Sequence, residues 1–315
     1  MKYYTNEVLE STKYVLYNSE HVSISDERIS KFCEENKLDA QQNGDWLQKS
    51  PFPINELNEN EKTHLMLAFN SLSFSYWGDP YWKVTYNNTT HQRGSWSLIA
   101  TLFRAREEGI DILNPSVQSK MSKETLEYIL RGNRKVPLLN ERLQIINQVG
   151  TIIQDEYNSD FRNMIQETKS APELLSVIID KIPTFEDTAS YKGKRVSFYK
   201  RAQALVESMV GLYDLSQADQ LTALADYILP KKLRDEGILL YDAKLSATID
   251  NKRNIQKGSI YEVEIRANTI WAVEKIKTNF AKKNIFLTSK EINDYLWLTG
   301  DKEKTNFHRT RTTSY

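Results

Sequence analysis

A run of apolar positions between residues 196 and 213 constrains the fold of this chain more than any other stretch. Its members recur every three or four residues, which is the spacing of one buried face of an α-helix. They are Val196, Tyr199, Ala202, Leu205, Val206, Met209 and Tyr213. The pattern therefore predicts a buried helix whose first turn lies near Arg195.

Three cations crowd the start of this predicted helix. Arg195, Lys200 and Arg201 stand where the positive end of the helix dipole disfavours cations, and the rings of Phe198 and Tyr199 lie among them. One interpretation is a site for an anionic or phosphorylated planar ligand, because the free N–H groups of a helix N-terminus also attract anions. The alternative is that the rings belong to the core and the cations to the solvated surface.

An acidic residue lies in apolar sequence a short distance further on. Residues 221–229 are typical of a short helix that Pro230 ends, with a capping box of Ser216 and Asp219 at its start. Within this stretch, Asp226 has mostly apolar neighbours. A carboxylate in such surroundings needs a partner or has a shifted pKa, as acid–base catalysts do. The alternative is an exposed Asp on the polar side of the helix.

Helix signals recur along most of the chain. Periodicity and caps predict helices over about 26–34, 61–69, 95–108, 123–130, 137–156, 171–179, 260–280 and from 289 onward. Strand signals are confined to short pieces, such as Trp82–Tyr86 with a hairpin turn at Asn87-Asn88. We therefore predict a mainly α fold, with one compact helical domain over residues 1–315 and at most a small β-hairpin or sheet.

Two further features suit a ligand. Aromatic residues that include Phe74 and Trp77 crowd around Gly78-Asp79-Pro80, and such a cluster either fills a satellite core or stacks on a heterocycle. Glu264 is not needed to cap the predicted helix over 260–280, so it is free to face a pocket. Its alternative role is that of a solvated carboxylate near the helix N-terminus.

The balance of charge limits what the chain binds. The 42 Lys and Arg residues equal the 42 Asp and Glu residues, so the formal net charge is zero. Proteins that bind nucleic acid normally carry a basic excess, which favours a small-molecule substrate over a stable nucleic-acid complex. The single cysteine, Cys33, excludes an internal disulfide, and the four histidines show no zinc-ligand spacing. No run is apolar enough for a membrane span or a signal peptide, which predicts a cytoplasmic protein.

Five stretches in a fixed order resemble a known family. They are Gly94–Leu98 with Ala105–Ile110, Gly193–Gln203, Ala225–Pro230, Val263–Arg266 with Trp271, and Phe307–Arg311. In these motifs the chain, from about Val22 onward, resembles the queuosine 5′-phosphate N-glycosylase/hydrolase family, also called queuosine salvage proteins. It departs from the family pattern at Asn70 and at Asn293, where the family usually has an acidic residue.

The resemblance implies a helical fold related to DNA glycosylases and hydrolysis of the N-glycosidic bond of queuosine 5′-monophosphate, with no metal or cofactor. Asp226 is then the catalytic candidate. The candidates for substrate binding are Phe198, Tyr199 and Trp77 for stacking, Lys200 for the base or phosphate, Glu264 for the cationic amine or guanidine-like edge, and Asn293 for the base. Two alternatives are a nucleic-acid glycosylase of the same architecture and a non-enzymatic queuosine-binding module.

Overall fold

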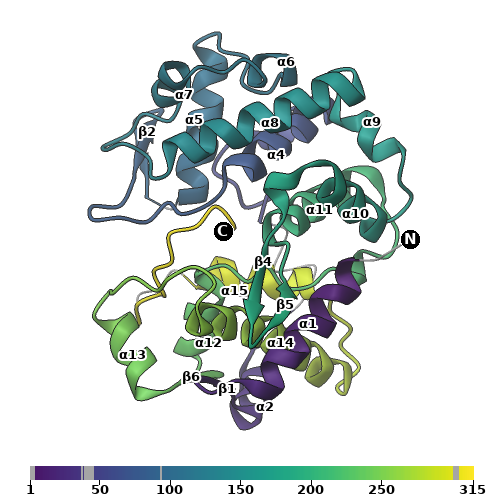
Figure 1. Cartoon of the computed structure of the whole chain (residues 1–315). Coiled ribbons are helices and arrows are strands. Elements are labelled where there is room, and N and C mark those ends of the chain that lie inside the picture. The colour runs from purple at the N-terminus through teal and green to yellow at the C-terminus, as the bar shows by residue number, and fades with distance from the viewer. Residues whose placement is uncertain (1–3, 37, 39–45, 93, 301–304) are drawn as a thin grey trace.

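Helices form most of the structure, a computed structural model that describes residues 4–36, 38, 46–92, 94–300 and 305–315 (Figure 1). The mainly α fold predicted from the sequence is confirmed. The helices of one half are α4 (Glu59–Leu72), α5 (Gly94–Glu107), α6 (Pro115–Gln118), α7 (Lys123–Ile129), α8 (Leu139–Tyr157), α9 (Phe161–Gln166), α10 (Ala171–Lys181) and α11 (Lys200–Tyr213).

The other half combines the two ends of the chain. Its helices are α1 (Tyr4–Asn18), α2 (Asp26–Glu35), α12 (Ile228–Asp235), α13 (Ala243–Asp250), α14 (Ile260–Ala281) and α15 (Ser289–Thr299). Short 3₁₀ helices lie at Ile54–Glu56, Pro183–Phe185 and Ala218–Gln220. Figure 1 shows the C-terminal segment running between the two halves.

Helix α14 joins two hydrophobic clusters. Val263, Ala267 and Ile270 pack into the cluster of the first half, whereas Ile265 and Ile276 pack into that of the second. Every residue of α14 from Glu262 to Ile270 is buried, polar and charged side chains included, so this part of the helix is enclosed on all sides. Shared packing of this kind supports a single domain over residues 1–315, which stays a prediction.

The strands form three antiparallel pairs. These are β1 (Val22–Ile24) with β6 (Leu239–Tyr241), β2 (Val84–Tyr86) with β3 (Thr89–His91), and β4 (Thr188–Tyr191) with β5 (Lys194–Ser197). The β2–β3 pair is the hairpin predicted from the sequence. Asn87 and Asn88 both have positive φ, 46° and 60°, as a two-residue hairpin turn with right-handed strand twist requires.

Most helix starts agree with the predicted caps. The side chains of Ser25, Asn58, Ser122, Ser170 and Thr288 each accept a backbone N–H in the first turn of α2, α4, α7, α10 and α15. These bonds satisfy donors that have no partner within the helix, so short polar residues mark the helix starts reliably.

Two local predictions near the motif residues are wrong. Residues 194–197 form strand β5 rather than the first turn of a helix, because Lys192 and Gly193 have positive φ and close a hairpin with β4. Residues 221–227 form no helix, and Pro230 lies in the first turn of α12, where its missing N–H costs nothing. The Ser216 hydroxyl donates to the carbonyl of Lys169 and forms no capping box with Asp219.

The described residues contain neither a candidate membrane-spanning helix nor a candidate metal cluster. None of their helices combines the length and apolar composition that a membrane crossing requires. No group of three or more His, Cys, Asp or Glu side chains among them is arranged to hold a metal ion.

Candidate functional site

A cavity of about 950 Å³ lies where the two halves meet. Its wall draws on the end of α4 and the loop after it, the first residue of α11, the segment leading into α12, helix α15 and the C-terminal segment. The volume is within the range of sites that enclose a nucleotide-sized ligand. Both halves of the molecule therefore contribute to one site.

Asp226 lies in this wall with 8 % of its surface exposed. Its Oδ1 accepts the backbone N–H groups of Ile228 (2.7 Å) and Leu229 (3.0 Å) at the start of α12. Among the described residues, none donates a hydrogen bond to Oδ2, which is left for a ligand in the cavity. Burial raises the pKa of Asp226, while the charge of Lys200 and the two N–H groups oppose that rise.

Lys200 is the cation that shares the cavity with Asp226. It begins α11 and lines the cavity, and no described residue forms a hydrogen bond or ion pair with its Nζ. Burial lowers the pKa of Lys200, and the charges of Asp226 and Glu207 oppose that change. Each charge thus supports the charged form of the other.

The other two cations of the predicted cluster do not line the cavity. Arg195 lies on β5, where its half-exposed side chain pairs with Glu186 at 3.0 Å. Arg201 is buried and donates to the carbonyl oxygens of Ser71 (3.1 Å) and Thr184. The predicted cluster of three cations at one helix start is therefore wrong, because the helix begins only at Lys200 and Arg201 is buried away from the cavity.

The adjacent aromatic pair is also absent from the cavity wall, contrary to the stacking role predicted for it. Phe198 is buried against the guanidinium of Arg266, whose carbon lies 3.9 Å from the ring centroid. Tyr199 is fully buried and its hydroxyl donates to Glu7 at 3.0 Å. The core interpretation of this pair is correct.

Trp77 does line the cavity. Arg311 lies over its ring at 3.6 Å from the centroid, and Arg311 also donates to the carbonyl oxygen of Trp77 at 2.9 Å. The C-terminal segment brings a further ring, Phe307, which stacks on Tyr227 with centroids 4.9 Å apart. The sequence did not identify Phe307 and Tyr227 as wall residues, although they belong to the family motifs Phe307–Arg311 and Ala225–Pro230.

The two amides at the unusual positions both reach the cavity. Asn293 Oδ1 accepts the backbone N–H of Leu224 at 3.1 Å, and Asn70 Nδ2 donates to the carbonyl of Met66 at 2.9 Å. With Oδ1 engaged, Asn293 keeps its Nδ2 donors for the cavity. Asn293 therefore lines the cavity, and its contact with a ligand stays a prediction.

Glu264 is a structural residue and lines no part of the cavity. It is fully buried and accepts the backbone N–H groups of residues 20, 21 and 22 at 3.0, 2.7 and 3.1 Å, together with the hydroxyl of Tyr191 at 2.8 Å. A carboxylate with this many donors fixes the chain between α1 and β1. The predicted role in binding the base is wrong.

We expect Glu264→Gln to destabilise the protein without changing its chemistry. The amide replaces one acceptor oxygen by a donor, so at least one buried N–H or hydroxyl loses its partner, at a cost of about 1–3 kcal/mol. The measurement is a denaturant titration, alongside the turnover of the folded variant. A large loss of turnover at unchanged stability would return Glu264 to the site.

Three of the aromatic rings that line the cavity lie close together. They belong to Trp46, Phe69 and Trp297, with ring centroids 5.4 Å apart for Trp46 and Phe69 and 6.0 Å for Trp46 and Trp297. Trp297 lies on helix α15. A helical tryptophan gives the same periodic signal whether it faces a core or a cavity, so only the structure separates the two.

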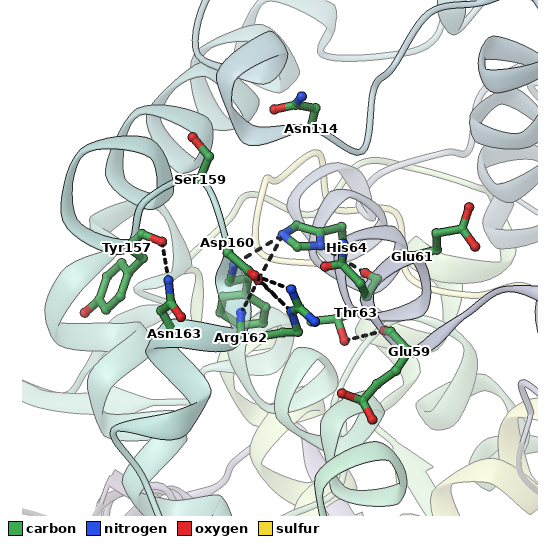
Figure 2. A network of polar contacts seen from close by, with 12 residues as sticks. Glu59, Glu61, Thr63, His64, Asn114, Tyr157, Ser159, Asp160, Arg162 and Asn163 are labelled. Carbon is green, nitrogen blue, oxygen red and sulfur yellow. Dashed lines mark hydrogen bonds and ion pairs between the residues drawn. The ribbon is translucent and has the colours of Figure 1, made fainter.

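A second polar network lies away from the cavity (Figure 2). His64 Nε2 accepts the backbone N–H of Phe161 at 3.2 Å, and its Nδ1 lies 2.9 Å from the carbonyl of Asn60. The neutral ring satisfies both contacts, and burial lowers the pKa of His64 accordingly. Asp160 caps α9 and pairs with Arg162. This network fixes α4 to α9 and needs no catalytic role.

The fold and the cavity define a mainly α protein with an internal site whose wall contains aromatic rings, the buried carboxylate of Asp226 and the cation of Lys200. The family model described as queuosine salvage protein matches residues 54–315. The chain belongs to the queuosine salvage protein family.

Individual relatives agree with this assignment. The chain is 34% identical to the queuosine 5′-phosphate N-glycosylase/hydrolase of Sphaerobacter thermophilus over 260 residues, which is 79% of this chain and 80% of that protein. It is 32% identical to the protein of the same name from Bos taurus over 97% of this chain and 98% of the relative. The protein of that name from Dictyostelium discoideum is also 32% identical, over 98% of each.

Proposed function

We propose that this protein hydrolyses the N-glycosidic bond of queuosine 5′-monophosphate and releases queuine for salvage into tRNA modification. The observation that carries the proposal is the carboxylate of Asp226, held at the cavity wall by two N–H groups with one oxygen left for the substrate. The names of the relatives supply the substrate, and the cavity supplies room and aromatic rings for its base.

The chemistry follows from the charge that develops as the bond breaks. The bond between C1′ and the base nitrogen cleaves with its electron pair on the base, so the sugar becomes oxocarbenium-like and the base anionic. Asp226 stabilises the cation and orients the water whose oxygen bonds to C1′. That water loses one proton and the base gains one, so the products are ribose 5-phosphate and queuine with a neutral heterocycle.

The departing base needs support of a particular kind. Queuine is a 7-deazapurine and has no N7 to protonate, so its charge is stabilised through the remaining nitrogens, the carbonyl and ring stacking. Trp77 offers a ring at the wall and Asn293 offers amide donors. We assign Lys200 to the base or the phosphate, and its charge opposes the rise in the pKa of Asp226 that burial causes.

The direct test is incubation of the purified protein with queuosine 5′-monophosphate, followed by chromatography for free queuine. The matched control is Asp226→Asn, which keeps the size and the acceptor oxygen for α12. No queuine from the folded wild type would refute the proposal.

Because the net charge is zero, we also expect no stable complex with tRNA at physiological salt, which a gel shift measures.

We expect Trp77→Ala to weaken substrate binding by about 1–3 kcal/mol, the usual scale for stacking of a base on an aromatic ring. Calorimetric titration in the Asp226→Asn background measures the affinity without turnover, and a thermal melt accompanies it. A lower melting temperature with unchanged affinity would instead mean that Trp77 only packs against Arg311.

A further inference from the structure

A buried ion pair outside the cavity wall forms hydrogen bonds with the backbone at Ala225, next to Asp226, and at Lys200. It consists of Asp187, which precedes β4, and Arg266 on α14, exposed by 3 % and 1 %. Neither residue lines the cavity. Any effect of this pair on the reaction must therefore pass through other residues.

The pair has the geometry of a rigid fork. Arg266 Nη1 donates to Asp187 Oδ1 at 2.9 Å, and Nη2 donates to Oδ2 at 2.6 Å. The rings of Phe198 and Tyr315 lie over the guanidinium at 3.9 and 4.5 Å from their centroids, and Glu262 approaches it at 3.5 Å. A planar guanidinium held by two bonds and two rings has little freedom to move.

Each partner also forms a hydrogen bond with the backbone at or beside one of the two charged candidates, the catalytic candidate Asp226 and the substrate-binding candidate Lys200. Arg266 Nε donates to the carbonyl oxygen of Ala225 at 3.0 Å, one residue before Asp226. Asp187 Oδ2 accepts the backbone N–H of Lys200 at 3.2 Å. The backbone carbonyl of Asp187 additionally accepts the N–H groups of residues 198 and 199, which lead into α11.

These contacts matter because Asp226 lies outside regular structure and Lys200 is only the first residue of α11. Asp226 follows a segment with neither helix nor strand, and Lys200 follows Tyr199, whose φ of 53° breaks the backbone between β5 and α11. A displacement of about 1 Å at a catalytic group can reduce turnover on the order of a hundredfold. Both segments therefore need a tie that regular hydrogen bonding does not supply.

From these contacts we infer that the Asp187–Arg266 pair is a positioning device that sets the carboxylate of Asp226 in register with the ammonium group of Lys200. The inference rests on the proposed function. The two residues then act as one unit, because the paired hydrogen bonds that hold Arg266 against Ala225 also hold Asp187 against Lys200.

The test compares Arg266→Lys, Asp187→Asn and the double variant with the wild type. Arg266→Lys keeps the charge and loses the fork, whereas Asp187→Asn keeps an acceptor and loses the charge. Glu264→Gln is the matched control, because it alters another buried carboxylate that holds backbone N–H groups away from the cavity. Turnover is expressed per folded molecule, from a thermal melt of each variant.

We expect kcat to fall on the order of tenfold to a hundredfold in each single variant, while KM changes less than about threefold. The double variant should lose little more than the more damaged single variant, because the two residues act as one unit. Glu264→Gln should keep the kcat of the wild type. A crystal structure of Arg266→Lys should show the carboxylate of Asp226 displaced from its wild-type distance to Lys200 Nζ.

Three results would overturn the inference: a kcat within about twofold of the wild type in either folded single variant, an equal loss in Glu264→Gln, or effects of the two single variants that multiply in the double variant. Failure of the proposed function is distinct, because the wild type itself would then release no queuine. In that case, or if Arg266→Lys is too unstable to assay, the crystal structure of Asp187→Asn decides. An unmoved Asp226 and Lys200 in that structure would refute the positioning role.

Discussion

The Asp226→Asn protein should fold and lose roughly two to four decades of turnover on queuosine 5′-monophosphate, the range for removal of a principal charge-stabilising or acid–base group. Asparagine keeps an oxygen that can accept the N–H groups of Ile228 and Leu229, so α12 keeps its start. What disappears is the negative charge beneath the sugar. The measurement is queuine release under single-turnover conditions.

The same substitution should raise the melting temperature at neutral pH. Burial raises the pKa of Asp226 in the folded protein above its unfolded value. The contribution of the neutral carboxyl to stability is therefore fully present below the unfolded pKa and is lost as the pH rises through the folded pKa. At neutral pH the ionised carboxylate costs stability, and the asparagine removes that cost. The difference in melting temperature should shrink as the pH falls.

Activity should decrease toward acid pH, where the contribution of Asp226 to stability increases. The proposed mechanism requires ionised Asp226, so we expect kcat/KM to fall as the pH decreases through the pKa of Asp226, which burial raises above its ordinary value. Turnover close to that of the wild type in a folded Asp226→Asn protein would remove this residue from the mechanism. A lower melting temperature with full loss of activity would point instead to a structural role in holding α12.

The sequence predicts the parts of this fold that local chemistry determines. Ser25, Asn58 and Thr288 cap helices because a short polar side chain is the nearest acceptor for the first N–H groups. The Asn87-Asn88 turn follows from the tolerance of asparagine for positive φ. Asp226, Lys200, Trp77 and Asn293 reach the cavity as expected for site residues.

Long-range contacts explain the failures. Residues 194–200 have helical periodicity, yet the hairpin turn at residues 192–193 and the pairing of β5 with β4 take precedence over it. Glu264 has no neighbour in sequence that reveals its role, because its partners are the backbone groups of residues 20–22, more than 240 positions away. Phe198 looks like a stacking ring until α14 brings Arg266 to its face. Tertiary contacts of this kind leave no periodic signal.

The monophosphate should be preferred over the nucleoside by tenfold or more in kcat/KM, and Lys200 should account for most of this preference. It is the one cation of the predicted cluster that lines the cavity, and among the described residues nothing pairs with its Nζ. Two other cations of the wall already have partners, since Lys231 pairs with Asp235 and Arg234 with Asp250. A charge-assisted contact to phosphate contributes roughly 1.5–3 kcal/mol, or about 10- to 150-fold.

The ratio of the two kcat/KM values isolates this contact. Lys200→Ala also weakens the support for ionised Asp226, but that effect is common to both substrates and cancels in the ratio. The matched control is Lys252→Ala, because Lys252 lines the cavity from an exposed position. We expect the ratio to fall toward one in Lys200→Ala and to stay at ten or more in Lys252→Ala. Added salt should lower the ratio of the wild type only to the extent that the contact between Lys200 and the phosphate is exposed to solvent. Equal kcat/KM values for nucleoside and nucleotide in the wild type at low salt would refute phosphate recognition, and a loss confined to Lys252→Ala would assign the phosphate to the rim of the cavity.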